Sequence, residues 1–81
     1  MRKNYSNKES WKIFSHNVAW LQKHHGLSNK KMAEALKIST ATLNKIKNGE
    51  LPPRLGVEIL YYIASEFKIS PYEQFTNWLK D

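Results

Sequence analysis

Three histidines are the side chains of this sequence with the clearest capacity for chemistry. They are His16, His24 and His25, and an imidazole can bind a metal ion or transfer a proton near neutral pH. The chain has no cysteine, no carboxylate stands at ligand spacing from the histidines, and adjacent histidines on a helix point in different directions. A nucleophilic serine would need an oriented base and an oxyanion site, which no pattern supplies. We therefore expect no catalytic site, no metal, no cofactor and no enzyme activity.

The remaining chemistry is cationic, and it is distributed unevenly along the chain. The formal net charge is +6. Residues 1–54 hold 11 Lys and Arg against three acidic residues, a charge of +8, whereas residues 55–81 hold two lysines against four acidic residues, a charge of −2. One interpretation is a face for a polyanion and another face for packing or pairing. The alternative is a solvated lysine surface without a ligand.

The composition is typical of a folded globular domain. Hydrophobic residues make up 41% of the chain and charged residues 25%, and the length suits one domain over residues 1–81. The first residues are polar, which predicts no signal peptide, and no stretch approaches the roughly 20 apolar residues of a membrane span. Together with the lack of cysteine, these features favour a cytoplasmic protein that does not enter a membrane.

The spacing of apolar residues predicts an all-helical fold. No stretch alternates strictly for four or more steps, so strands are not expected. A capping box at Ser6 and Glu9 would start a first helix that runs to about residue 25. Two prolines mark a loop before a fourth helix over residues 54–67. A fifth helix would start at Ser70 as its N-cap, with Pro71 at the first helical position and Glu73 completing a capping box. Its apolar face would be Phe75, Trp78 and Leu79.

Two short helices are predicted between these longer ones, over residues 28–37 and 39–48. Ser28 and Ser39 can cap their starts, and Asn48-Gly49 can end the second. Helices of this length are marginal alone, so neighbouring helices must hold them, and their outer faces remain free to contact a ligand. The side chains that the periodicity turns outward on the second short helix are Thr40, Ala41, Asn44 and Lys45.

This arrangement resembles the helix-turn-helix domain of the lambda-repressor, Cro and C1 type, the XRE family. The resemblance covers residues 18 to about 75 and implies a compact five-helix bundle in which residues 28–48 form the helix-turn-helix. Residues 39–48 would be the recognition helix, in the major groove of double-stranded DNA. The matching positions are Leu21, Gly26-Leu27-Ser28, Met32-Ala33, Leu36, Ile38-Ser39, Thr42-Leu43, Ile46, Asn48-Gly49, Pro53, Leu60, Ala64, Phe67 and Ile69-Ser70.

The resemblance also implies the roles of individual residues. The base-reading positions correspond to Thr40, Ala41, Asn44 and Lys45, whose side chains suit thymine methyl groups, adenine and guanine. Residues expected to contact DNA phosphates are Asn29, Lys30, Lys31, Ser39, Lys47, Asn48 and Arg54.

Three positions depart from the family pattern. Gln22 and Lys47 stand where the family often has arginine and glutamate. We therefore expect a familiar internal ion pair to be absent and Lys47 to add a cation beside the groove. Asn29 replaces a glutamine that usually grips a phosphate, which shortens that contact.

The function that follows is sequence-specific binding of double-stranded DNA by a prokaryotic or phage transcriptional regulator, a repressor that occludes an operator on the nucleoid. One alternative is the antitoxin of a toxin–antitoxin pair, with a toxin as partner. Another is a helical protein–protein module without DNA binding. A homodimer is expected through an exposed aromatic patch formed by Tyr61, Tyr72, Phe75 or Trp78.

Overall fold

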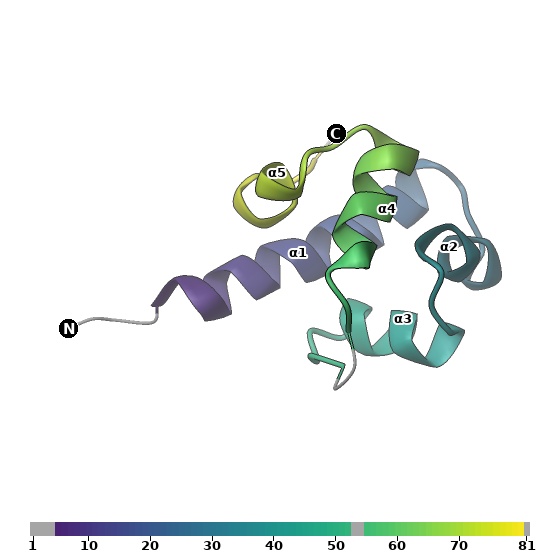
Figure 1. Cartoon of the computed structure of the whole chain (residues 1–81), viewed down its shortest axis with the longest axis horizontal. Coiled ribbons are helices and arrows are strands. Elements are labelled where there is room, and N and C mark those ends of the chain that lie inside the picture. Colours follow the sequence, from purple (N-terminus) through teal and green to yellow (C-terminus); the bar gives the residue numbers. More distant parts are fainter. Residues whose placement is uncertain (1–4, 53–54, 81) are drawn as a thin grey trace.

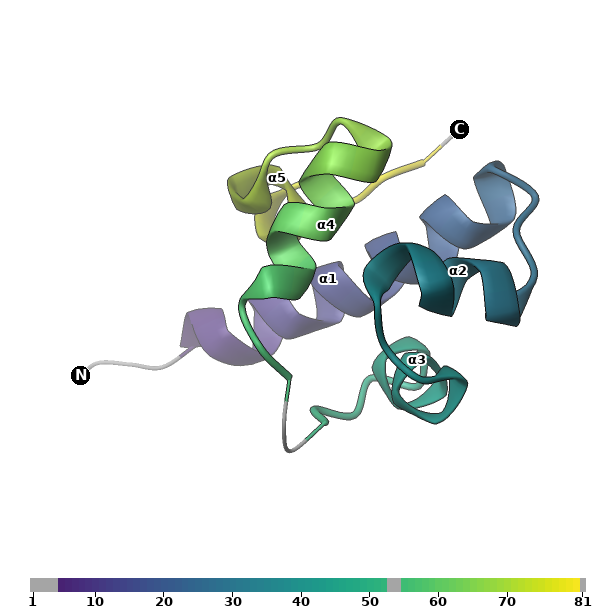
Figure 2. The ribbon, with the colours of Figure 1, turned by 45° about the vertical axis from the view of Figure 1, so that its right-hand side comes forward.

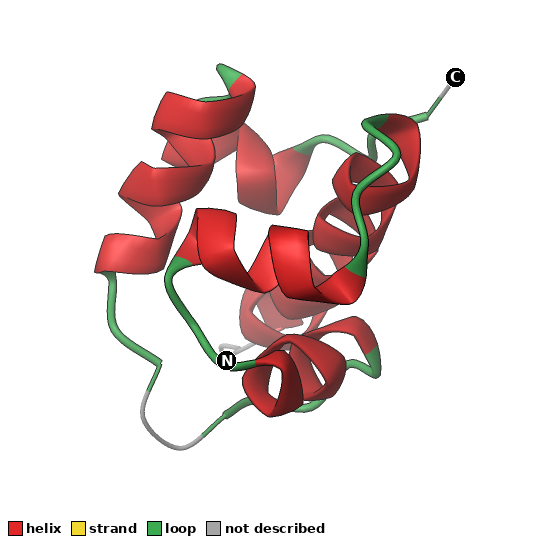
Figure 3. Ribbon diagram, turned by 90° about the vertical axis from the view of Figure 1, so that its right-hand side faces the viewer, coloured by secondary structure: helices red, strands yellow, loops and turns green. Residues whose placement is uncertain are grey.

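Five helices form the regular structure in a computed structural model, which describes residues 5–52 and 55–80. They are α1 (Tyr5–His24), α2 (Asn29–Leu36), α3 (Thr40–Lys47), α4 (Glu58–Phe67) and α5 (Pro71–Thr76). Within the described residues no segment forms a strand (Figure 3). The predicted all-helical five-helix bundle is confirmed.

The long helix α1 lies beside the shorter helices along most of its length (Figure 1). It contacts α3 and α5, while α4 packs against α2 and α5. The radius of gyration is 12.2 Å, close to the value of about 12 Å expected for a compact chain of this size. Among the described residues, none of the helices combines the length and the hydrophobicity that a membrane span needs.

One cluster of buried apolar side chains holds α1 to α4 together. Apart from the adjacent pair Met32 and Ala33, its members on each helix lie three or four residues apart, as the 3.6-residue period requires. The members of the cluster, all apolar, are Phe14, Val18, Leu21, Met32, Ala33, Leu36, Leu43, Ile46, Ile59 and Ile63.

Serine caps begin three of the helices, as the sequence predicts. Ser28 accepts a hydrogen bond from the Lys31 amide, and Ser39 accepts one from the Thr42 amide. At α5, Ser70 and Glu73 form a reciprocal capping box. Each cap satisfies amides that a helix start leaves without partners. Because the caps fix where α2 and α3 begin, they also set the tight turn between these two helices.

Two predicted helix starts are wrong. The first helix already includes Ser6, so this serine is not its N-cap. The fourth helix begins at Glu58 rather than at residue 54. Leu55 is half-buried against the core and precedes Gly56, a poor helix former, so the chain enters α4 through an irregular segment that ends in a turn at Val57.

The predicted apolar face of the fifth helix is also wrong in part. Helix α5 ends at Thr76, so Trp78 and Leu79 lie in the segment that follows it. The buried side chain of Asn17 on α1 binds the end of α5 and the segment after it. Its Nδ2 donates to the carbonyls of Gln74 and Asn77 at 2.9 and 2.8 Å, and its Oδ1 accepts from the Leu79 amide at 2.9 Å. These bonds compete with continuation of the helix.

The C-cap of α4 gives a stability prediction. Lys68 adopts φ +60° there, a left-handed conformation that costs a residue with a Cβ about 1–2 kcal/mol. Part of that cost returns through the greater chain entropy of an unfolded glycine. We expect Lys68→Gly to stabilise the fold by about 0.5–1 kcal/mol in urea titrations. Lys68→Ala, which loses the same charge but keeps the Cβ, should show no such gain.

Candidate nucleic-acid interface

Helix α3 forms one edge of the molecule, with no other helix over its outer side (Figures 1 and 2). Its inner side is anchored because Leu43 and Ile46 are completely buried. In the turn before α3 the chain changes direction at Lys37, the C-cap of α2, which has φ +59°. Ile38 then packs against the core. The rotation of α3 about its own axis is thereby fixed.

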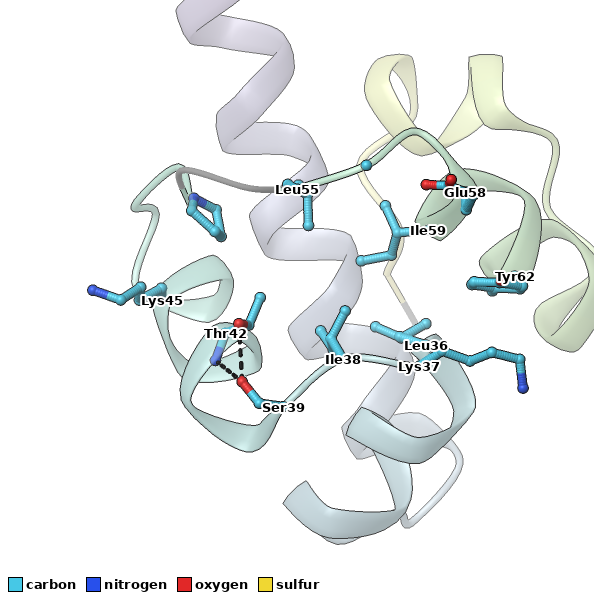
Figure 4. A pocket seen from close by; sticks show the side chains of 12 residues that line it. Leu36, Lys37, Ile38, Ser39, Thr42, Lys45, Leu55, Glu58, Ile59 and Tyr62 are labelled. Carbon is cyan, nitrogen blue, oxygen red and sulfur yellow. Dashed lines mark hydrogen bonds between the residues drawn. The ribbon is translucent and has the colours of Figure 1, made fainter.

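All four predicted base-reading residues lie on the free side of α3. Thr40, Ala41, Asn44 and Lys45 are exposed, and they fall within two successive turns of one helix. In Figure 4 the Lys45 side chain extends away from the body of the protein. The face therefore presents a hydroxyl, a methyl, a carboxamide and an ammonium group, which match the hydrogen-bonding and apolar features of base edges.

One acidic residue beside this face was not singled out from the sequence. The Glu50 carboxylate lies 3.8 Å from the Lys45 ammonium, and the two side chains are 59% and 52% exposed. Gly49, at φ +84°, turns the chain back, and the Glu50 amide donates to the Lys45 carbonyl at 2.8 Å. Lys45 and Glu50 are five residues apart and face each other across a turn, so the helical period does not predict their contact. The one feature of the sequence that points to it is Gly49, which favours a turn.

The positions that depart from the family pattern form a polar cluster. The Lys47 ammonium donates to Gln22 Oε1 at 2.9 Å and to Asn29 Oδ1 at 2.7 Å. Gln22 Nε2 donates to Asn29 Oδ1 at 2.8 Å and to the Leu27 carbonyl at 3.1 Å. The cluster ties α1, α2 and α3 together with one cation and no carboxylate.

The residues expected to contact phosphates lie around the two short helices. Asn29, Lys30, Lys31, Ser39 and Asn48 are exposed, and Lys47 is half-buried. Ser39 already accepts from the Thr42 amide and donates to Thr42 Oγ1 (Figure 4), so its hydroxyl is occupied as a cap. Arg54 lies outside the described residues.

A helix-turn-helix family model matches residues 19–74, more than half of the chain. The chain belongs to the Cro/C1-type helix-turn-helix, or XRE, family. It is therefore a DNA-binding transcription regulator of the XRE type, and its partner is double-stranded DNA. No curated protein and no solved structure matches it.

The first part of α1 precedes the range that the XRE-family model matches. Trp11, in this part, donates from its indole Nε1 to the Gly49 carbonyl at 3.1 Å. Its ring centroid lies 5.1 Å from that of Phe14, which stacks in turn on Phe75 at 4.8 Å. An element beyond the matched range thus supports the turn that ends α3.

A cavity of about 530 Å³ separates α3 from α4 in this XRE-family domain. Its walls include the apolar side chains of Leu36, Ile38 and Ile59, and the Lys45 side chain borders it (Figure 4). The charged ends of Lys37 and Lys45 both point away from the cavity. The Lys45 ammonium therefore faces outward, on the side on which α3 is free.

The four aromatic residues expected at a dimer interface come from different parts of the domain. Tyr61 on α4 and Tyr72 on α5 are well exposed. Trp78 follows α5 and its ring lies edge-on to His16 at 5.2 Å. Phe75 packs against the core and stacks on Phe14, so it does not contribute to an exposed patch. Val57, 68% exposed, stands one turn before Tyr61, which is 64% exposed.

Proposed function

We propose that this chain is a repressor that binds a specific operator and blocks access of RNA polymerase to a promoter. The carrying observation is the free face of α3, where four side chains suited to base edges project from a helix anchored by two buried residues. In a helix-turn-helix the second helix enters the major groove and the first crosses the phosphate backbone. The site of action is then the nucleoid, in the cytoplasm.

Each exposed residue has a role in this proposal. Lys45 donates to guanine O6 and N7, Asn44 bonds adenine, and Thr40 and Ala41 meet thymine methyl groups. Phosphates are contacted at the start of α2 and around the end of α3, where cations supply affinity without sequence preference. The residues that we assign to phosphates are Asn29, Lys30, Lys31, Lys47, Asn48 and Arg54. Ser39 joins them only by giving up the hydrogen bond from its hydroxyl to Thr42 Oγ1.

Selection of bound duplexes from a random pool tests the proposal. A repressor should enrich one motif, and its symmetry and half-site spacing would appear in the same experiment. The expected preference over random duplex is about a thousandfold or more. Binding without an enriched motif would contradict operator recognition. No binding to any duplex at low salt, at tens of micromolar protein, would favour a helical protein–protein module instead.

The same proposal includes a two-fold dimer through the exposed face of α4. Val57 and Tyr61 are adjacent on this face, and aromatic residues are enriched in the centres of protein interfaces. A symmetric dimer would place two copies of α3 about 34 Å apart, one turn of DNA. Sedimentation velocity with and without an enriched duplex measures the assembly. A single copy of the chain on each duplex would contradict the dimer.

Glu50 should oppose DNA binding, because its carboxylate lies 3.8 Å from the Lys45 ammonium and competes with DNA for it. We expect Glu50→Gln to raise affinity for any duplex by about two- to fivefold at low salt, with the gain shrinking as salt screens the charge. Fluorescence anisotropy at several salt concentrations measures this. Glu66→Gln removes an equal charge near the end of α4 farther from α3 (Figure 1) and should change affinity less. Equal gains from the two variants would show a general charge effect.

A further inference from the structure

The hydrogen bonds of the Gln22, Asn29 and Lys47 cluster fix the orientation of both carboxamides. The Leu27 carbonyl can only accept, so the Gln22 atom 3.1 Å from it is the nitrogen. The Lys47 ammonium can only donate, so the atoms that it contacts at 2.9 Å on Gln22 and 2.7 Å on Asn29 are oxygens. These two groups remove the usual ambiguity between oxygen and nitrogen in an amide.

The consequence concerns Asn29, the first residue of α2. Its Oδ1 accepts from both Gln22 Nε2 and Lys47, so the oxygen faces the cluster. Its Nδ2 makes no hydrogen bond to any residue of the described part, and Asn29 is exposed. The donor end of this carboxamide is therefore free on the surface beside α3.

We infer that Gln22 is a positioning residue for DNA binding. Together with Lys47 it holds the Asn29 carboxamide so that Nδ2, rather than Oδ1, meets a DNA phosphate, and Gln22 makes no DNA contact itself. A phosphate oxygen needs a donor, so a carboxamide turned the other way would repel it. The inference rests on the proposed function and adds to it the means by which Asn29 is oriented.

The cluster also differs from an ion pair in its net charge. Lys47 is held by two neutral oxygens, so the cluster keeps its unit of positive charge. In an arginine–glutamate pair at positions 22 and 47 the two charges would cancel. The orientation of Asn29 and the charge of Lys47 thus act on the same anionic backbone, and phosphate contacts of this kind do not depend on base sequence.

A double-mutant cycle on mixed-sequence duplex at low salt tests the inference. Gln22→Met keeps the length and charge of the side chain but removes its hydrogen bonds, and we expect affinity to fall about fivefold. Asn29→Ala should cost roughly tenfold. In the Asn29→Ala background Gln22→Met should cost less than about twofold, since there is no carboxamide left to orient. In an Asn44→Ala background, which leaves the cluster intact, the fivefold loss should persist.

A measurement without DNA separates orientation from general damage to the fold. The heteronuclear NOE of the Asn29 side-chain amide should indicate a rigid group in the wild type. In Gln22→Met it should fall toward the level of Asn44, because only the bond from Lys47 then holds the Asn29 side chain, while backbone values stay unchanged. Gln22→Asn, which is too short to bridge the same partners, provides a second variant and should give the same result.

The outcomes distinguish the two proposals. If the wild type binds duplex but Gln22→Met binds equally well, or if its loss persists unchanged without the Asn29 side chain, the positioning role is wrong and DNA binding stands. If the wild type binds no duplex, the proposed function fails and the positioning role fails with it.

Discussion

Asn17→Ala should destabilise the fold by about 3 kcal/mol, because three hydrogen bonds to buried or half-buried backbone groups are lost and each is worth about 1 kcal/mol. The Asn17 side chain is buried and holds α5 and the following segment against α1. The midpoint of thermal unfolding should fall by about 12–24 °C for a domain of this size. Urea titration and circular dichroism would measure both quantities.

His16→Ala is the matched control for this prediction. His16 is the preceding residue and contacts the same segment through one hydrogen bond, from Nε2 to the Leu79 carbonyl at 2.7 Å, at an exposed site. Its loss should cost about 1 kcal/mol or less. Similar losses for the two variants would show that burial of the Asn17 bonds does not matter, and a loss below 1 kcal/mol for Asn17→Ala would contradict the prediction.

The largest expected effect on binding comes from Lys45→Ala. It should weaken binding to an enriched operator by about 1–3 kcal/mol and relax preference at one base pair, as loss of a base contact does. Competition titrations with operators changed one base pair at a time would measure both effects. The fold should be unaffected, since Lys45 is exposed and, among the described residues, its one ion pair is with exposed Glu50.

Lys30→Ala tests the contrast between base and phosphate contacts. Lys30 is exposed near the start of α2, and its loss should lower the slope of log K against log salt by about one with no change of base preference. Should Lys45→Ala instead weaken all duplexes equally, Lys45 would have to be reassigned to a phosphate.

The apolar periodicity and the serine caps predict most of the fold. The same residues that repeat every three or four positions fill the core, and Ser28, Ser39 and Ser70 cap helices as expected. These features are local, so a single sequence contains them. The exposed face of α3 follows from the same period, because burial of Leu43 and Ile46 leaves the opposite side free.

The polar interactions were harder to predict because they join residues far apart in the chain. Asn17 bonds Leu79 across 62 positions, and Lys47 bonds Gln22 across 25. The one feature of the sequence that pointed to the hydrogen bonds of Asn17 was its position, as a polar residue, within the apolar stripe of α1. The length of α5 could not be predicted for the same reason, since Asn17 takes the carbonyl groups and the amide at its end.

The bond from the Trp11 indole to the Gly49 carbonyl gives the molecule a natural optical reporter. Indole emission is sensitive to hydrogen bonding and polarity, and this ring contacts the turn at which α3, the proposed recognition helix, ends. A variant that keeps Trp11 and has phenylalanine at the other two tryptophan positions would report DNA binding at α3 through the fluorescence of Trp11. Operator titrations could then be followed without attaching a dye to protein or DNA.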